Sequence, residues 1–183
     1  VADVEPFERR KLALLNGSHS LLAYAATILG HQTVDEAIAD PRCQSWVEQW
    51  WDEACAQLPL PEAELAAYRQ ALLSRYRNPN IRHALAQIAS DGSLKLPVRI
   101  VPTLRADLAA GRVPEGACRA VAAWVLHLRG LGAPVKDVNA AEVLSLVGGS
   151  LADAVAAVLG YLGLADEPGV AEAVGRLASE LAA

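Results

Sequence analysis

Helix-length segments rich in alanine and leucine, separated by glycines and prolines, are the feature that most constrains the fold of this sequence. They recur over most of the chain, and no strand-like alternation of apolar and polar residues is sustained over several segments. Alanine and leucine are strong helix formers, whereas glycine and proline interrupt helices. Aromatic residues make up only 5% of the sequence, so the core has to be built mainly from Ala, Leu and Val. The pattern predicts an all-α, multi-helix bundle-like fold.

Local start and stop signals place the expected helices along the chain. A proline in the first turn and Gly30 at the end predict a first helix over residues 6–29. Asn78 is suited to cap a helix over residues 79–89. Residues 96–102, LPVRIVP, are compatible with an extended segment or with the start of another helix. Further helices are expected at residues 34–39, 43–58, 61–77, 101–110, 114–128, 140–146, 151–162 and 168–181.

Length, charge and cysteine content limit the classes of protein that fit. The 183 residues suit one domain, residues 1–183, and the net charge of −5 gives no basic face for nucleic acid or an anionic membrane. No apolar run approaches the roughly 20 residues of a membrane span, and no signal peptide is visible. The cysteines lack a paired spacing, which indicates buried thiols in a reducing, cytoplasmic compartment. They are Cys43, Cys55 and Cys118.

Residues 11–20, KLALLNGSHS, interrupt an apolar helical pattern with four residues that weaken a helix. On an ideal α-helix, at about 100° per residue, His19 lies about 80° and Asn16 about 140° around the axis from Lys11. The three side chains therefore span one side of the helix, with Lys11 and His19 about 12 Å apart along its axis. Lysine, carboxamide and imidazole form a coherent set for moving a proton on an alcohol or carbonyl group.

Either of two groups in this stretch could serve as the proton acceptor. Lysine acts as a base only when its pKa falls from about 10.4 towards neutrality, and burial, the helix dipole and the cations Arg9 and Arg10 favour such a fall for Lys11. His19 could accept the proton near its unperturbed pKa. Asn16 could donate a hydrogen bond to a developing alkoxide. The residues alone leave the choice between lysine and histidine open.

Two other interpretations also fit the residues. In the first, the polar side chains of residues 11–20 are solvated or kink-forming residues of a non-catalytic helical interaction module. In the second, the chain is a metal-dependent enzyme. The other histidines, His31, His83 and His127, lack the spacing of metal ligands, and no histidine–carboxylate cluster stands out. No metal site is therefore predicted.

The stretch resembles the signature of the polyol-specific long-chain dehydrogenases, the family of mannitol dehydrogenase and fructuronate reductase (mannonate oxidoreductase). The family pattern is Lys, four residues, Asn, two residues, His, and Lys11, Asn16 and His19 have this register. A second block, RYRNPNIRHALAQIASDGSLKLPVRI at residues 75–100, is similar to the family's RY/F-x-NP…DGSxKLPxR segment. The resemblance covers residues 4–102 and fades beyond them.

The resemblance implies a two-domain enzyme in which an N-terminal Rossmann domain binds NAD and a helical C-terminal domain supplies most catalytic residues. This chain matches only the second domain, and no G-x-G-x-x-G motif follows a strand in it. The chain starts at Val1 and contains no methionine, as expected of a sequence that begins just before the family's catalytic helix. The Rossmann domain is therefore the expected partner, and the isolated domain is expected to be inactive.

By this resemblance, Lys11 is the general base, Asn16 helps to form the oxyanion site, and His19 binds and orients the substrate. Lys95 would reach the hydroxyl or carboxylate end of the substrate, which is expected to be a sugar alcohol or a uronate. Arg82 and His83 are expected at the same polar rim. For Asn78, Asp91 and Ser93, turn and capping roles suffice.

One position bears on the choice of substrate. Many mannitol-type members have an arginine eight residues before the lysine of the DGSxK motif, whereas this sequence has Gln87 there. Gln87 makes the chain more similar to the fructuronate reductase branch, and it is expected in the substrate site. A uronate carboxylate needs a cation, which Arg82, Lys95 or Arg99 could supply.

Overall fold

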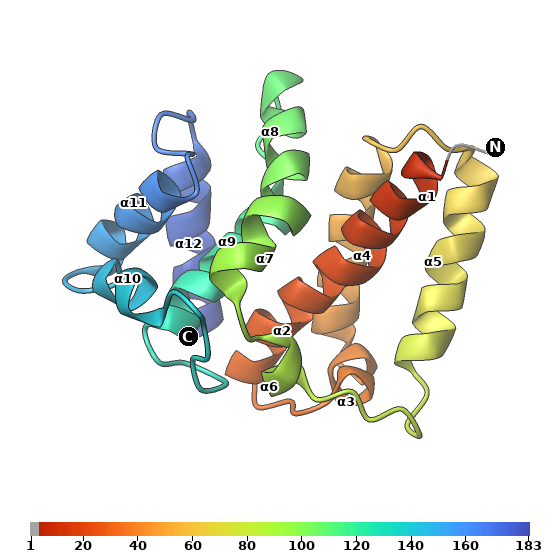
Figure 1. Ribbon diagram of the computed structural model, residues 1–183, viewed down its shortest axis with the longest axis horizontal. Coiled ribbons are helices and arrows are strands. Elements are labelled where there is room, and N and C mark those ends of the chain that lie inside the picture. The colour runs from red at the N-terminus through yellow and green to blue at the C-terminus, as the bar shows by residue number, and fades with distance from the viewer. Residues whose placement is uncertain (1–3) are drawn as a thin grey trace.

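A long N-terminal helical rod organises the fold (Figure 1). In the computed structural model, which describes residues 4–183, the rod consists of α1 (Glu5–Arg10), a π-helical section η1 (Lys11–Gly17) and α2 (Ser18–Ile28). The prediction of one helix over residues 6–29 is thus confirmed in extent. The other helices are α3 (Val34–Ala39), α4 (Pro41–Cys55), α5 (Glu62–Tyr76), α6 (Leu85–Ile88), α7 (Gly92–Arg99), α8 (Val101–Ala109), α9 (Glu115–Leu128), α10 (Ala140–Ser145), α11 (Leu151–Tyr161) and α12 (Val170–Ala182).

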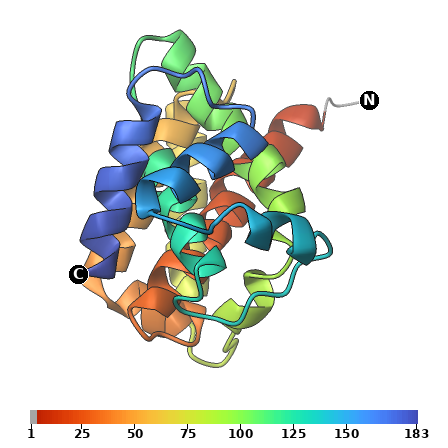
Figure 2. The same cartoon turned by 90° about the vertical axis from the view of Figure 1, so that its left-hand side faces the viewer.

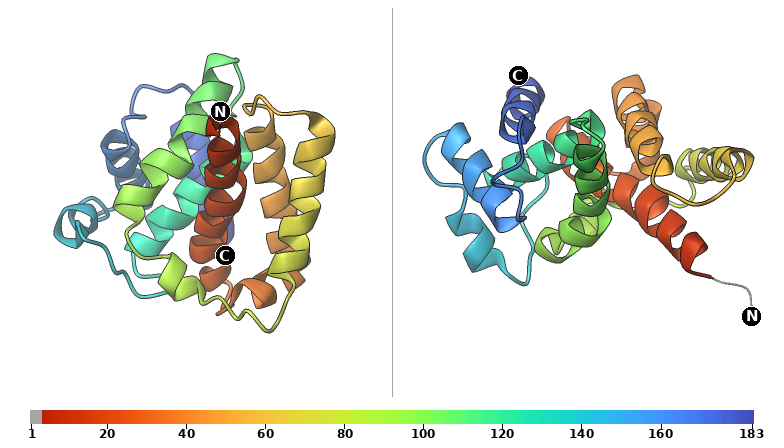
Figure 3. Two further views of the ribbon diagram at one scale, coloured as in Figure 1. Left: turned by 45° about the vertical axis from the view of Figure 1, so that its right-hand side comes forward. Right: turned by 90° about the horizontal axis from the view of Figure 1, so that it is seen from above.

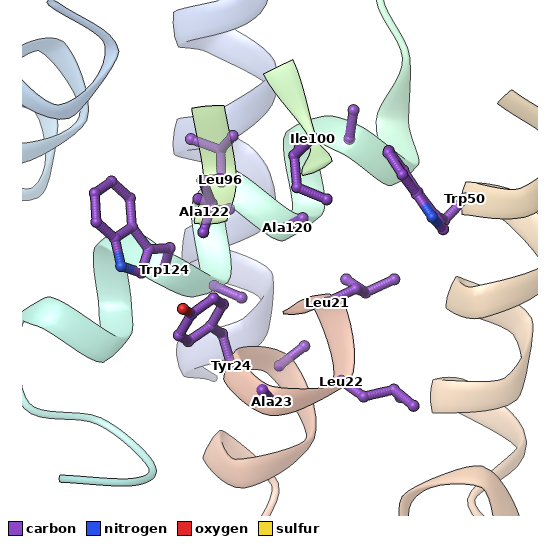
Figure 4. Close-up of a cluster of buried hydrophobic side chains, with 14 of the residues drawn as sticks. Leu21, Leu22, Ala23, Tyr24, Trp50, Leu96, Ile100, Ala120, Ala122 and Trp124 are labelled. Carbon is purple, nitrogen blue, oxygen red and sulfur yellow. The ribbon is translucent and has the colours of Figure 1, made fainter. Parts of the chain in front are cut away.

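The buried helix α9 forms the centre of the core. All its residues from Gly116 to Leu128 are buried, and they pack against α2, α4 and α12. Small side chains such as Ala120 and Ala122 let neighbouring helices approach closely, and Figure 4 shows them facing Leu21 and the α7 side chain Leu96. Helices α10, α11 and α12 cover the side of the core away from α5 (Figure 2). The all-α prediction is confirmed.

Side chains from α4 hold the π-helical section in place. The indole Nε1 of Trp50 donates to the carbonyl oxygen of Ala13, and that of Trp51 donates to the oxygen of Leu14, both at 2.9 Å. The Ser18 hydroxyl donates to the same Leu14 oxygen at 2.6 Å. A π-helix bonds each carbonyl five residues ahead and has a wider turn than an α-helix. Donors from outside the helix therefore stabilise the wide turn.

The wide turn changes the positions expected for the polar residues of the rod. Ideal α-helical geometry overestimates the angle between Lys11 and Asn16, because each residue of a π-helix rotates less around the axis. Residues five apart in a π-helix therefore lie closer to the same face than they do in an ideal α-helix. The helix is not interrupted at Asn16, Gly17, Ser18 and His19. The segment that was expected to interrupt it spans the end of the π-helical section and the start of α2.

The segment between α5 and α6 is a loop, and the prediction of a helix over residues 79–89 is wrong except for α6. The Asn78 side chain accepts a hydrogen bond from the backbone N–H of Asn80 at 3.0 Å, which forms a turn instead of a helix cap. The His83 carbonyl accepts from the N–H of Val34 at 3.0 Å. Pairing with the segment before α3 therefore holds this part of the chain extended.

Three further expectations have different outcomes. Residues 96–102 are helical, since they contain the end of α7 and the start of α8. Cys43 and Cys118 are buried free thiols as predicted, whereas Cys55 is free but only half-buried. Within residues 4–183, none of the helices has the length and apolar character required to cross a membrane.

We expect Gly17→Ala to destabilise the protein, because its Cβ would lie 2.6 Å from a ring carbon of the buried Trp50. Overpacking of this kind costs about 1–3 kcal/mol. The matched control is Gly175→Ala in α12, where a Cβ has no neighbour within 4 Å and helix propensity should add up to about 1 kcal/mol. Urea unfolding of both variants measures the difference, and equal midpoints would contradict the Trp50 contact.

Candidate active site

The outward face of the rod carries the three residues singled out by the sequence. Lys11 is exposed, and Asn16 and His19 are half-buried, whereas Leu14 and Gly17 on the inner face are buried. Figure 3 (left) shows this rod with α7 and α8 on one side and α4, followed by α5, on the other. The expectation that the rod itself buries Lys11 is wrong, because the side chain lies on the exposed face.

The His19 ring is held between two other rings. It stacks on Tyr76, with centroids 5.0 Å apart, and meets His83 edge-on at 5.2 Å. Burial, followed by the charges of His83, Arg75 and Arg99, lowers the pKa of His19 from 6.5 to about 4. The imidazole is therefore neutral at pH 7, with one nitrogen able to donate and the other able to accept a hydrogen bond.

A pocket beside His19 brings together residues from the end of α5 and the following loop. Arg82 and His83, predicted as substrate-binding residues, line this pocket with His19, as does Tyr76. Arg75, which precedes Tyr76 at the end of α5, also lines the pocket and was not predicted. Lys11, Asn16, Lys95 and Gln87 do not line it. The lining residues that were not predicted for a substrate site are Val34, Asp35, Arg75, Tyr76, Ile81 and Asn78. Of these, Asn78 was expected to have a turn role.

Helix α7 places two cations on the other side of the rod. The Arg99 guanidinium donates to the hydroxyl of Ser20 at 3.2 Å, and the Lys95 ammonium donates to the carbonyl oxygen of Ile88 at 3.0 Å. Burial and the charge of Arg99 lower the pKa of Lys95. Gln87 is exposed on α6. The structure thus distributes the predicted cations along both flanks of the rod.

A carboxylate outside both sequence blocks fixes the start of α7. Asp137 accepts hydrogen bonds from the backbone N–H of Ser93 at 2.9 Å and from its hydroxyl. Asp91 accepts from the N–H of Val138 at 3.0 Å and makes no side-chain cap bond to α7. Between them, Gly92 has no room for a side chain, because a Cβ would lie 2.4 Å from Trp124 Nε1. Asp91 occupies the N-cap position of α7 at the end of a turn, as predicted, but the side chains of Asp91 and Ser93 bind the loop before α10 instead of capping the helix.

A second polar cluster lies at the start of α4, away from the rod's outward face. His31, Asp40 and Cys43 bring three possible ligand atoms within 4.8 Å of one another, which the sequence spacing did not indicate. The Asp40 carboxylate already accepts from His31 Nε2 at 3.1 Å and from the Arg42 side chain at 2.8 Å. Burial raises the pKa of the Cys43 thiol to about 12. Asp40 also caps α4 by accepting from the backbone N–H of Arg42 at 2.9 Å, so these contacts account for the cluster.

The fold and this face define a class, an all-helical domain with a lysine, an amide and a neutral histidine along one helical rod. The chain belongs to the mannitol dehydrogenase C-terminal domain family. The sequence model of this family matches residues 3–177. D-mannonate oxidoreductase of Escherichia coli (strain K12) is 38% identical over 133 residues, which are 72% of this chain and 27% of that protein. Altronate oxidoreductase of Yersinia enterocolitica is 39% identical over 132 residues, 71% of this chain and 27% of that protein.

Solved structures share the fold. The mannitol 2-dehydrogenase of Pseudomonas fluorescens, solved as a ternary complex with NAD and D-mannitol, superposes with a TM-score of 0.90 at 32% identity. The match covers 99% of this chain and 39% of that one. A D-sorbitol dehydrogenase in substrate-free form has a TM-score of 0.85 at 22% identity, which shows the common fold alone. The chain thus spans well under half the length of the relatives that it matches.

We expect the His19 ring to stay neutral down to a pH of about 4, which NMR titration of its Cε1–H signal measures. Arg75→Gln should raise the pKa of His19, because removing a nearby positive charge favours the protonated ring. Arg77→Gln is the control, since that guanidinium donates to the Gln44 side chain at 3.0 Å and lies outside the pocket. A His19 pKa near 6.5 would contradict the burial of the ring.

We expect Asp137→Ala to destabilise the protein by about 1–3 kcal/mol, because the N–H and hydroxyl of buried Ser93 lose their acceptor. Asp166→Ala, at an exposed turn, is the control and should change the stability by less than about 0.5 kcal/mol. Urea unfolding gives both values. Equal stability of the two variants would mean that the loop before α10 does not fix the start of α7.

Proposed function

We propose that this domain supplies the substrate-binding and proton-transferring residues of an NAD-dependent oxidoreductase that acts in the cytoplasm. The reaction interconverts a secondary alcohol of a polyol or aldonate with the corresponding ketose or keto-uronate. The alignment of Lys11, Asn16 and His19 along the outward face of one helix, in a chain of the mannitol dehydrogenase C-terminal domain family, carries this proposal. The named relatives act on mannonate, altronate and mannitol.

The nucleotide is assigned mainly to a second domain. Residues 4–183 contain no strand followed by a glycine-rich turn and a helix, which is the structure that binds a dinucleotide in a Rossmann domain. NAD therefore does not fit this chain alone. The hydride acceptor would be held by an N-terminal Rossmann domain of the same protein, and the isolated chain is expected to be inactive.

Apolar side chains beside the rod's outward face are consistent with such a neighbour. Phe7 is 44% exposed and Leu12 is 36% exposed on the rod, and Val98 of α7 is 53% exposed. Leu12 and Val98 also line one shallow cavity with Arg9. Apolar groups gathered on one face favour a covered surface. The Rossmann domain would cover this face and close the site.

Each residue of the outward face has a distinct role in this proposal. The Lys11 amine accepts the hydroxyl proton during oxidation and returns it during reduction, without a metal ion. The Asn16 carboxamide donates a hydrogen bond to the substrate oxygen as negative charge develops there. The neutral His19 ring binds and orients a substrate hydroxyl. Because Lys11 is exposed in this chain, exclusion of water by the second domain would favour its neutral amine.

Positive charge on both flanks of the rod favours a substrate that carries a carboxylate. Arg82 lies on one flank, and Lys95 and Arg99 lie on the other. Lys95 would have to leave the Ile88 carbonyl in order to bind substrate. An aldonate or uronate fits this charge better than a neutral polyol, and Gln87 agrees with that preference.

The exposure of Lys11 also favours one alternative, a helical interaction module without chemistry. In such a module, the apolar and cationic side chains of the outward face would bind another protein, and Lys11 would be a solvated surface residue. Turnover measurements distinguish the two functions. Removal of a single polar group such as Lys11 would lower turnover only if the group takes part in catalysis.

We expect Lys11→Ala to lower kcat by about 10²- to 10⁴-fold in a protein that contains residues 1–183 together with their nucleotide-binding domain. The reason is loss of the proton acceptor, so the basic limb of the pH profile should also disappear. Lys136→Ala, which removes another exposed lysine, is the control and should leave turnover unchanged. Near-normal turnover of Lys11→Ala together with an inactive His19→Ala variant would assign the base to histidine instead.

A further inference from the structure

The pocket beside His19 contains two arginines without a partner. Arg75 and Arg82 form no ion pair and no side-chain hydrogen bond with any of residues 4–183, although both line the pocket. Several other arginines of this acidic chain form ion pairs, as Arg69 does with Asp52 at 2.7 Å. Two unpaired guanidiniums at one pocket provide the planar donors that bind a carboxylate in a bidentate manner.

The backbone holds Arg82 in a conformation that is unfavourable for a residue with a side chain. Its φ is 44°, in the left-handed region, which is unfavourable for a non-glycine residue. Leu85 N–H donates to the Gln32 carbonyl at 2.9 Å, and a bridge between Thr33 and Ala84 lies beside it. Tertiary contacts therefore maintain the strain, as they do at many ligand sites.

An acceptor for a hydroxyl group lies in the same pocket. Asp35 of α3 lines it, and one carboxylate oxygen of Asp35, Oδ1, is buried without a hydrogen-bond partner. A buried acceptor without a donor destabilises the protein. A ligand hydroxyl would satisfy it. Because Asp35 also repels a bare anion, the pocket suits a carboxylate that carries a hydroxyl beside it better than a simple carboxylate.

We propose that the mouth of this pocket is the subsite for the carboxylate end of a sugar acid, with the exposed Arg75 and Arg82 binding the carboxylate. The enclosed part, about 10 Å³, has room for one hydroxyl-sized group, from which Asp35 would accept a hydrogen bond. The inference rests on the proposed function and deepens it, because it names the group that separates an aldonate from a polyol. His19 lines the same pocket and stacks on Tyr76, so its imidazole would meet the next hydroxyls of the sugar acid.

D-mannonate and D-mannitol test the subsite, because they differ only at the carboxylate end. Arg75→Gln and Arg82→Gln are compared with Arg77→Gln in the protein that includes the nucleotide-binding domain. Loss of one charge-assisted pair should lower kcat/KM for D-mannonate on the order of 10- to 100-fold, mainly through KM. The loss for D-mannitol should be much smaller, because D-mannitol lacks the carboxylate, and Arg77→Gln should affect neither substrate.

Three kinetic results would overturn the subsite: an equal loss on both substrates, no loss on either, or a wild-type protein that oxidises D-mannitol but not D-mannonate. A wild-type protein that oxidises no polyol or aldonate, D-altronate included, would instead remove the proposed function. NMR titration of residues 1–183 with sodium D-mannonate then still decides the subsite. Saturable shifts of the His19 and His83 ring signals that Arg82→Gln abolishes would support it, and absence of such shifts would refute it.

Discussion

The rest of this structure depends on two indole N–H groups that donate to one stretch of helix backbone. Trp50 and Trp51 of α4 bind the carbonyls of Ala13 and Leu14, each at 2.9 Å, inside the π-helical section. In a wide turn, some backbone carbonyls lose the regular hydrogen bonds of an α-helix. Without donors from outside the helix, these buried carbonyls would be left unsatisfied. The tryptophans thus stabilise the local geometry of the rod and join it to the core at the same point.

This contact explains why four weak helix formers occur together in the first long apolar segment. Gly17 has to lack a side chain because the Trp50 ring occupies that space, and the Ser18 hydroxyl binds the Leu14 carbonyl at 2.6 Å. Both residues therefore serve the inner face of the rod. Asn16 and His19 lie on the more open face, where polar groups remain available for a ligand. One short stretch thus combines a packing requirement with a chemical one.

Periodicity and punctuation predicted most helices, because Ala- and Leu-rich segments between glycines and prolines favour helix with or without tertiary contacts. The prediction of a helix directly after Asn78 was wrong because tertiary contacts decide the structure there. There the backbone of His83 bonds to Val34, and the distant segment before α3 overrides local preference. Asp137, which binds the DGSxK segment, was not predicted for the same reason. It lies 44 residues beyond Ser93, and no spacing rule connects the two residues.

The sequence by itself determined the helical class, the register of Lys11, Asn16 and His19, and the resemblance to a family of two-domain dehydrogenases. These follow from local pattern and residue order, which the chain carries in any conformation. Only the tertiary structure decided that the rod widens at η1, that burial and neighbouring cations lower the pKa of His19 to about 4, and that Arg75 faces the same pocket as Arg82. Such properties depend on which distant groups lie within a few ångströms, and packing of the whole chain sets those distances.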